Sequence, residues 1–344
     1  MASKKSAGAL AYGGEEGPTS SSPPDVRTGL ISGVTFSAKP VQYLAVEGRA
    51  MFEGDICLGS VDELERGVGL SQASDDVVAL GVGITGAQYR WPGALMPYDI
   101  DSSLPNQARV TDAIAHWEAN TTMRFVKRTS ANASQYPNYV RVFDDGGCYS
   151  MLGMRGGMQN LSLGSGCSTG NAIHEFGHAW GLWHEQSRED RDTWVQINWA
   201  NITSGYESQF NQHISDGDDL GGYDYGSIMH YPAGAFSKNG QPTIVQLKSG
   251  PTIGQRTALS VGDIAAVHAM YRTTHYNVGV SSVYSTPHSK NAWAYLAGFG
   301  WRKVEGLTTD GVSNTFAVLA LARANGRNVH ATFDGSTITA AYGA

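Results

Sequence analysis

The sequence predicts an α+β protein, and three observations lead to that prediction. Its 344 residues include 43 glycines and 16 tyrosines, a composition that favours many turns on a β-rich scaffold. Between Pro105 and Asn120, apolar residues recur at helical spacing, namely Val110, Ala113, Ile114 and Trp117. Met123–Val126 and Tyr139–Phe143 alternate like strands, and Asn160–Leu163 is a shorter strand candidate.

Composition and charge narrow the expected partners. Hydrophobic residues make up 41% of the chain and charged residues 16%, as in an ordinary folded protein. The formal net charge is −7, and the sequence has no stripe of Lys and Arg able to displace counterions from phosphates. No apolar run approaches the roughly 18–20 residues that a bilayer-spanning helix needs. We therefore expect neither a nucleic-acid partner nor a membrane span.

Changes in composition divide the chain into four parts. Residues 1–35 are rich in Ser, Gly, Pro and Ala and read as a flexible lead. Residues 36–81 are mixed, and 82–272 form the main domain. Residues 273–344 read as a small β-rich module, in which Phe316–Ala322 and Val329–Phe333 carry strand-type patterns.

The sequence leaves the compartment of the protein open. The first six residues carry charge without an apolar stretch behind it, so the protein stays inside or an export signal was removed. Cys148 and Cys167 are separated by a short loop and can pair, which would imply an oxidising compartment. Two free, partly buried thiols are an equal alternative on spacing alone.

The segment from His174 to His184 has the spacing of a metal site. His174 and His178 are four residues apart, which puts both imidazoles on one face of a helix. Glu175 projects toward an adjacent face, where it can hold a water molecule without binding the metal. Gly181 can end the helix in the left-handed conformation, so that the chain turns and delivers His184.

Three neutral histidines with one open position are the ligand set of a catalytic zinc ion. Such a zinc ion lowers the pKa of its water and polarises a scissile carbonyl, while Glu175 takes the proton and returns it to the leaving amine. A pair of ordinary surface histidines on a helix is the alternative. The glycine and the third histidine at fixed spacing argue against it.

The run from His174 to Asp192 (HEFGHAWGLWHEQSREDRD) resembles the signature of the astacin family of metzincin zinc metalloendopeptidases. Tyr225–Tyr231 (YGSIMHY) is similar to the Met-turn of that family. The resemblance covers residues 82–272 and implies a metzincin-like catalytic domain. We expect a twisted, mostly antiparallel-edged sheet, long helices and a zinc cleft between two subdomains.

The resemblance also implies roles for single residues. Met229 would form a hydrophobic floor beneath the zinc, and Tyr231 a displaceable ligand whose hydroxyl stabilises the oxyanion. Without the histidine motif, both would read as core residues. Cys148 and Cys167 fall where the family has a disulfide. The family's other common disulfide is missing, since Thr122 stands where one of its cysteines is expected.

Upstream, the segment Phe52-Glu53-Gly54-Asp55 resembles an element of the family's propeptides. There the aspartate binds the zinc in place of water and keeps the zymogen silent, a role the resemblance gives to Asp55. Cys57, two residues on, is an alternative zinc ligand. A third possibility is that neither residue reaches the metal and the propeptide packs elsewhere.

We expect a secreted latent zymogen that is cut between roughly Gly81 and Ile84. The resemblance then buries the new N-terminus near Glu185. It places an extended peptide substrate along an edge strand at Asn160, Leu161 and Ser162. Arg256 lies where some relatives have a basic residue near the pocket for the first substrate residue after the cleaved bond. A solvated surface arginine is the alternative.

Two other functions remain open in the sequence. The chain could be a catalytically silent binding protein that acts through residues 273–344, or a hydrolase of non-peptide esters or amides. The C-terminal module could bind substrate, bind a cell surface or cap the catalytic domain.

Overall fold

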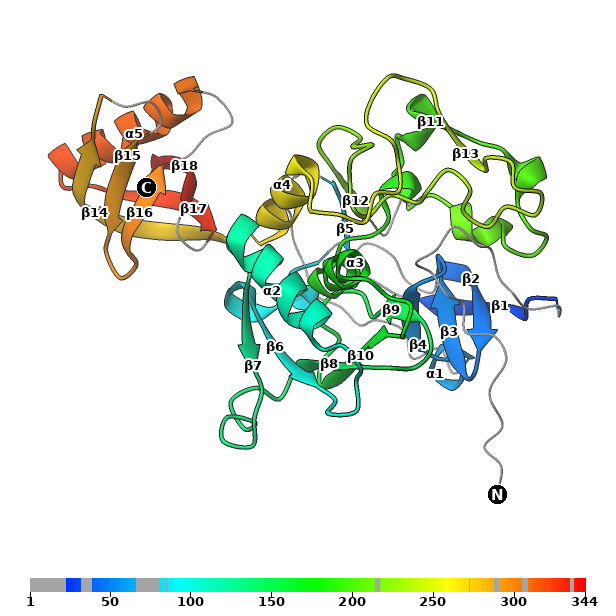
Figure 1. Ribbon diagram of the computed structural model, residues 1–344. Coiled ribbons are helices and arrows are strands. Elements are labelled where there is room, and N and C mark those ends of the chain that lie inside the picture. The colour runs from blue at the N-terminus through cyan, green and yellow to red at the C-terminus, as the bar shows by residue number, and fades with distance from the viewer. Residues whose placement is uncertain are drawn as a thin grey trace. The chain divides into compact units, whose positions relative to one another are not determined.

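The computed structural model describes residues 23–31, 39–65, 81–84, 86–213, 217–271, 273–287, 291–304, 309–334 and 337–344. The chain divides into two compact units, Met1–Met270 and Tyr271–Ala344 (Figure 1). Each unit has its own hydrophobic core, and each is described by itself.

A sheet of nine strands runs through the described residues of the first unit, in the order β1-β2-β3-β4-β9-β10-β8-β6-β7. Its strands are β1 (Val26–Ile31), β2 (Lys39–Val46), β3 (Arg49–Phe52), β4 (Ile56–Ser60), β6 (Leu95–Ile100), β7 (Arg124–Lys127), β8 (Tyr139–Phe143), β9 (Cys148–Ser150) and β10 (Met158–Leu163). Strands β1 to β4 pair antiparallel, and β4 joins β9 in parallel at Ile56 and Ser150. Strands β1 to β4 therefore extend the sheet that β6 to β10 form, the part called the catalytic region below because the expected zinc motif lies there.

Two helices support the site, α2 (Ala108–Asn120) and α3 (Thr169–Trp180). They pack through Trp117 and Trp180, whose ring centroids lie 6.4 Å apart, and Trp117 Nε1 donates to the Ile173 carbonyl at 3.0 Å. A capping box of Ser168 and Asn171 satisfies free N–H groups at the start of α3. This end is therefore fixed by local chemistry as well as by packing.

Smaller elements close the first unit. They are α1 (Val61–Glu65), α4 (Val261–Met270), the pair β5 (Gly81–Ile84) and β12 (Gly217–Leu220), and the pair β11 (Val195–Ile197) and β13 (Ile244–Gln246). Short 3₁₀ turns lie at Ala87–Tyr89, Pro92–Ala94, Glu185–Ser187, Arg191–Thr193, Trp199–Asn201 and Glu207–Phe210. In the described part of the chain, no helix combines the length and apolar character needed to cross a membrane.

The second unit is a closed barrel with strand order β14-β15-β16-β18-β17. Its elements are β14 (Thr273–Ser285), β15 (Ala292–Leu296), β16 (Gly300–Val304), α5 (Thr309–Ala324), β17 (Asn328–Asp334) and β18 (Thr337–Gly343). Strands β16 and β18 pair in parallel and the other neighbours antiparallel. Five strands in the order 1-2-3-5-4, with a helix between the third and fourth, form the topology of an OB-fold barrel.

The predicted elements are confirmed with two corrections. The helix before Asn120, the strands at 123–126, 139–143 and 160–163, and the strand at Val329–Phe333 are all present. Phe316–Ala322 is wrong as a strand, because it lies within α5, where Val312, Leu319 and Ala322 share the buried face. The prediction that residues 1–35 form a flexible lead is wrong at Val26–Ile31, because this segment is a strand that pairs with β2. Residues 1–22 lie outside the described part.

Candidate metal centre

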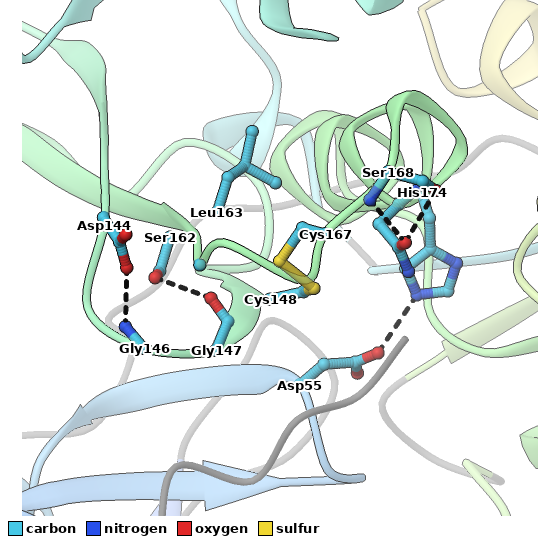
Figure 2. The surroundings of a disulfide bond; sticks show 12 residues. Asp55, Asp144, Gly146, Gly147, Cys148, Ser162, Leu163, Cys167, Ser168 and His174 are labelled. Atoms are coloured by element: carbon cyan, nitrogen blue, oxygen red, sulfur yellow. Dashed lines mark hydrogen bonds and ion pairs between the residues drawn. A yellow bond between two sulfur atoms is a disulfide. The ribbon is translucent and has the colours of Figure 1, made fainter. Parts of the chain in front are cut away.

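Three histidines and one aspartate converge in the first unit. One ligand atom from each of His174, His178, His184 and Asp55 lies within 4.8 Å of all the others, and all four residues are buried. Asp55 Oδ2 is 3.2 Å from His174 Nε2, a contact that Figure 2 shows, and Asp55 Oδ1 is 3.1 Å from His184 Nε2. The residues predicted from spacing and from the resemblance thus form one cluster.

Helix α3 delivers these ligands because of two glycines. Gly181 ends the helix with φ 105°, the left-handed conformation, and the chain turns there toward His184. Gly177 faces Met229, and a Cβ atom at Gly177 would lie 2.6 Å from the Met229 sulfur. Met229 therefore packs directly against the helical turn that carries His174 and His178.

Each imidazole is oriented through its Nδ1 atom. His174 Nδ1 lies 2.7 Å from the Ile228 carbonyl, and His178 Nδ1 lies 2.7 Å from the Leu182 carbonyl. Only a ring N–H can bond a carbonyl oxygen, so these two rings carry the proton on Nδ1 and leave Nε2 free to accept a metal. His184 Nδ1 instead contacts a side chain, Glu53 Oε2, at 2.9 Å.

The donor set fits a zinc ion. Three imidazole nitrogens and one carboxylate oxygen are the ligand types of tetrahedral zinc. His184 Nε2 and Asp55 Oδ1 lie 3.1 Å apart, and neither atom makes any other hydrogen bond in the described residues. Polar atoms buried in this way are costly unless something binds them. Burial lowers the pKa of His174 and of His178, so both rings are neutral, as metal ligands must be.

Glu175 lies beside this cluster. It is buried, its Oε2 atom has no hydrogen-bond partner in the described residues, and it follows the first histidine on α3. Burial and then the charge of Asp55 raise the pKa of Glu175 well above its usual range. A carboxylate with a raised pKa is a better proton acceptor near neutral pH.

The segment at residues 53–55 is a tight turn held by the catalytic region. Glu53 and Gly54 have positive φ values of 45° and 76°. The Glu53 carboxylate contacts His184 and accepts hydrogen bonds from the Ser187 hydroxyl and from His213 Nε2, the last at 3.0 Å. The basic partners His213 and His184 outweigh the cost of burial and lower the pKa of Glu53 to about 2, so the carboxylate is ionised.

Backbone contacts fix the same turn. The Tyr231 hydroxyl donates to the Glu53 carbonyl at 2.6 Å, and the Gly54 N–H donates to Gln209 Oε1 at 2.8 Å. Cys57 lies in β4, buried, with its sulfur 3.7 Å from the Gly59 carbonyl and outside the ligand cluster. Asp55, rather than Cys57, therefore faces the histidines, and the alternative in which neither residue approaches them is wrong.

Sequence reasoning missed the supports of this turn. Glu53 lies within the segment Phe52–Asp55, and no spacing in the sequence connects this segment to Ser187, Gln209 or His213. The one available signal is chemical: a carboxylate in a segment expected to enter a sealed cleft needs partners.

Arg256 is anchored to the backbone of the Met-turn. It is half-buried, and its Nη1 atom donates to the Ile228 carbonyl at 2.8 Å and to the His230 carbonyl at 3.0 Å. The alternative of a solvated surface arginine is therefore wrong. Its place in a substrate pocket stays a prediction.

The disulfide between Cys148 and Cys167 is present, with Cα atoms 5.9 Å apart (Figure 2). It ties the start of β9 to the segment before α3. Strand β10 lies between β9 and β8 in the sheet, and β9 in turn pairs with β4. The expectation that Asn160, Leu161 and Ser162 lie on an edge strand is therefore wrong. Leu161 and Ser162 are fully buried, and the Ser162 hydroxyl donates to the Gly147 carbonyl at 2.7 Å.

Glu185 lies at a pocket next to the site. Leu182, Gly222, Met229 and Asp263 are among the residues that line this pocket. Glu185 Oε1 accepts the Asp224 N–H at 2.8 Å, and burial raises the pKa of Glu185 to about 8. Arg188 Nε already lies 3.8 Å from Glu185 Oε1, and a further cation nearby would stabilise this buried carboxylate more.

Three histidines on a helix and the turn behind it, with a glutamate beside the first and a methionine beneath, define the metzincin class of zinc sites. A model of the Astacin peptidase family matches residues 83–272, more than half of the chain. The chain therefore belongs to the astacin family.

Relatives from animals are similar over the same region. Zinc metalloproteinase nas-15 of Caenorhabditis elegans is 44% identical over 186 residues, which is 53% of this chain and 32% of that protein. Meprin A subunit beta of Homo sapiens is 36% identical over 244 residues, 66% of this chain and 34% of that protein. The matches thus span about a third of each relative.

A solved structure is also similar. High choriolytic enzyme 1, a hatching enzyme zinc-protease from the medaka Oryzias latipes, is 33% identical with a TM-score of 0.47, covering 59% of this chain and 98% of that one.

Proposed function

We propose that this chain is a zinc metalloendopeptidase that hydrolyses peptide bonds in proteins. The convergence of three histidine Nε2 atoms beside the buried Glu175 supports the proposal most strongly. When bound, zinc supplies Lewis-acid polarisation of the substrate carbonyl and acidifies a water molecule. Glu175 would take a proton from the attacking water and return it to the leaving amine. The Tyr231 hydroxyl, once released from Glu53, donates to the oxyanion.

Digestion of casein by the activated chain, with and without a chelator, tests this proposal. Glu175→Gln should lower the rate by roughly 100- to 10,000-fold, the usual contribution of a general base, and leave bound zinc unchanged when measured by atomic absorption. Proteolysis that survives the chelator, or survives the Glu175 substitution, would contradict it. A zinc-loaded chain without any proteolysis would favour the silent binding protein instead.

We further propose that residues 36–81 act as an inhibitory propeptide. Asp55 would supply the fourth zinc ligand, where the reaction needs water. Glu53 adds two contacts that would hold the segment in the site, because its carboxylate binds the His184 ring and its carbonyl accepts a hydrogen bond from the Tyr231 hydroxyl. The latent state is thus supported through the metal position, through one ligand ring and through the oxyanion donor.

Activation would be a cut between roughly Gly81 and Ile84. This segment is strand β5, paired with β12, and the Ile84 N–H donates to the Gly181 carbonyl at 2.7 Å. The cut therefore lies beside the end of α3 and near the pocket at Glu185, where a new ammonium group would meet a buried carboxylate. N-terminal sequencing of the active form tests this, and a start upstream of Asp55 would contradict it.

The proposed enzyme acts outside the cell. The Cys148–Cys167 disulfide supports this location, since such bonds persist in oxidising compartments. Fractionation of cultures that express the full-length gene, with thiol labelling of the exported protein, checks both points.

A further inference from the structure

The second unit carries a row of aromatic side chains on the outside of its barrel. On β15 the residues alternate in burial, with Ala292, Ala294 and Leu296 inside the barrel. Trp293 and Tyr295 therefore point outward. The register pairs Tyr295 with Trp301 of β16 and Trp293 with Tyr284 of β14.

These residues form one continuous surface, which we call the aromatic face. Its members are Ser282 and Tyr284 on β14, Trp293 and Tyr295 on β15, and Trp301 and Lys303 on β16. The exposed fractions are 53% for Tyr284, 39% for Tyr295 and 47% for Trp301. Large aromatic side chains on the outside of a small barrel are unusual unless they serve binding.

The rings are held in place before any ligand arrives. Tyr295 and Trp301 contact each other edge to face, with centroids 5.7 Å apart. Trp293 Nε1 donates to Asn291 Oδ1 at 2.8 Å, and the Asn291 side chain donates in turn to the Thr286 hydroxyl at 2.7 Å. A rigid aromatic surface loses little conformational entropy on binding.

The position of the face within the topology points to the kind of ligand. In OB-fold barrels the surface of the second and third strands binds oligonucleotides or oligosaccharides. Here those strands are β15 and β16 (Figure 1), which carry three of the four aromatic rings. The choice between the two ligands depends on charge.

The low charge of the aromatic face favours an oligosaccharide over an oligonucleotide. Single-stranded nucleic acid needs a positively charged groove as well as stacking rings, whereas Lys303 is the only charged member of the aromatic face. The flat C–H faces of a pyranose stack on aromatic rings, and the polar edges of Tyr and Trp reach its hydroxyl groups.

We propose that the aromatic face binds the glycans of glycoproteins, and so holds a glycosylated substrate close to the protease. The choice of glycoproteins as the source rests on the proposed function, because an enzyme that cuts proteins meets glycans on its substrates. The binding itself does not need catalysis, so the two proposals can fail separately.

The test measures binding of the full chain, with Glu175→Ala to prevent cleavage, to immobilised fetuin before and after enzymatic removal of its glycans. The intact chain should bind glycosylated fetuin and lose that binding after deglycosylation. Replacing Tyr295 and Trp301 with alanine should weaken binding by roughly tenfold or more, as for aromatic residues central to an interface. Trp301→Phe, which keeps a stacking ring, should retain most of it.

Tyr342→Ala is the matched control, since Tyr342 is an exposed aromatic residue of β18 outside the aromatic face. It should bind as the parent does. Equal binding to deglycosylated fetuin, no binding at all, or preference for an oligothymidylate would each overturn the proposal.

Cleavage of a short unglycosylated peptide by the activated chain separates this proposal from the proposed function. Trp301→Ala in the active background should cleave that peptide at the parental rate. Failure of the parent to cleave it would count against the peptidase and leave the glycan result standing.

Discussion

The two sides of the metal centre differ in where their supports come from. His174 and His178 lie on α3, and backbone carbonyls of the catalytic region hold their Nδ1 atoms. His184 follows the helix, and its Nδ1 atom contacts Glu53 of the upstream segment. Two ligands are thus oriented independently of the upstream segment, whereas the third would lose its Glu53 partner in the proposed activation.

This difference gives the proposed latent state two separable components. Asp55 would act at the ligand position itself, and Glu53 would act on the ring behind it and on Tyr231. Each component should then be removable without the other.

Asp55→Ala in the uncleaved chain should produce proteolytic activity without any cut. Breaking a buried ion pair costs roughly 3–5 kcal/mol, which corresponds to about a hundredfold or more in the population of the open cleft. Cleavage of a quenched fluorescent peptide measures this activity, and a gel verifies that the chain itself is uncut. Cys57→Ser should stay latent; activity in that variant would show that the thiol, and not Asp55, blocks the site.

Glu53→Gln should have a smaller effect of the same kind. Hydrogen bonds to a charged group contribute roughly 1.5–3 kcal/mol, so we expect about a tenfold rise in the activity of the uncleaved chain. The same substitution should leave kcat/KM of the cleaved enzyme unchanged, because Glu53 is then gone.

Glu65→Gln controls for loss of a propeptide carboxylate. Glu65 pairs with Arg27 at the surface, where ion pairs contribute little, so the latent state should be unaffected. If the uncleaved Glu53→Gln chain shows no more activity than the uncleaved Glu65→Gln chain, Asp55 alone accounts for latency.

The ligands could be predicted from sequence, and their supports could not. His174, His178 and His184 lie within eleven residues, so one helix and the turn at Gly181 bring them together. The contact between Glu53 and His184 spans 131 positions and depends on β4 joining β9. Long-range strand pairing has no local pattern, and the same cause placed Asn160–Leu163 wrongly on an edge.

The error at Phe316–Ala322 has a different origin. Its Phe and Val residues have strand propensity, and a short apolar run does not separate a strand from a buried helix. The spacing of Val312, Leu319 and Ala322 carries the helical signal, but Val312 lies before the segment Phe316–Ala322. Tyr271–Ala344 form a compact unit with a closed barrel, and its helix α5 was not predicted from the sequence.

Gly177→Ala should weaken the side of the site that does not depend on the propeptide. The new Cβ would lie 2.6 Å from the Met229 sulfur, and overpacking of this kind costs roughly 1–3 kcal/mol. We expect a lower melting temperature and weaker zinc binding in both the latent and the cleaved forms, measured by calorimetry and by competition with a chelating dye. Gly234→Ala, at a position with open space around it, is the control. Because Gly177 lies between two ligands that the catalytic region orients, a loss confined to the latent form would contradict the comparison.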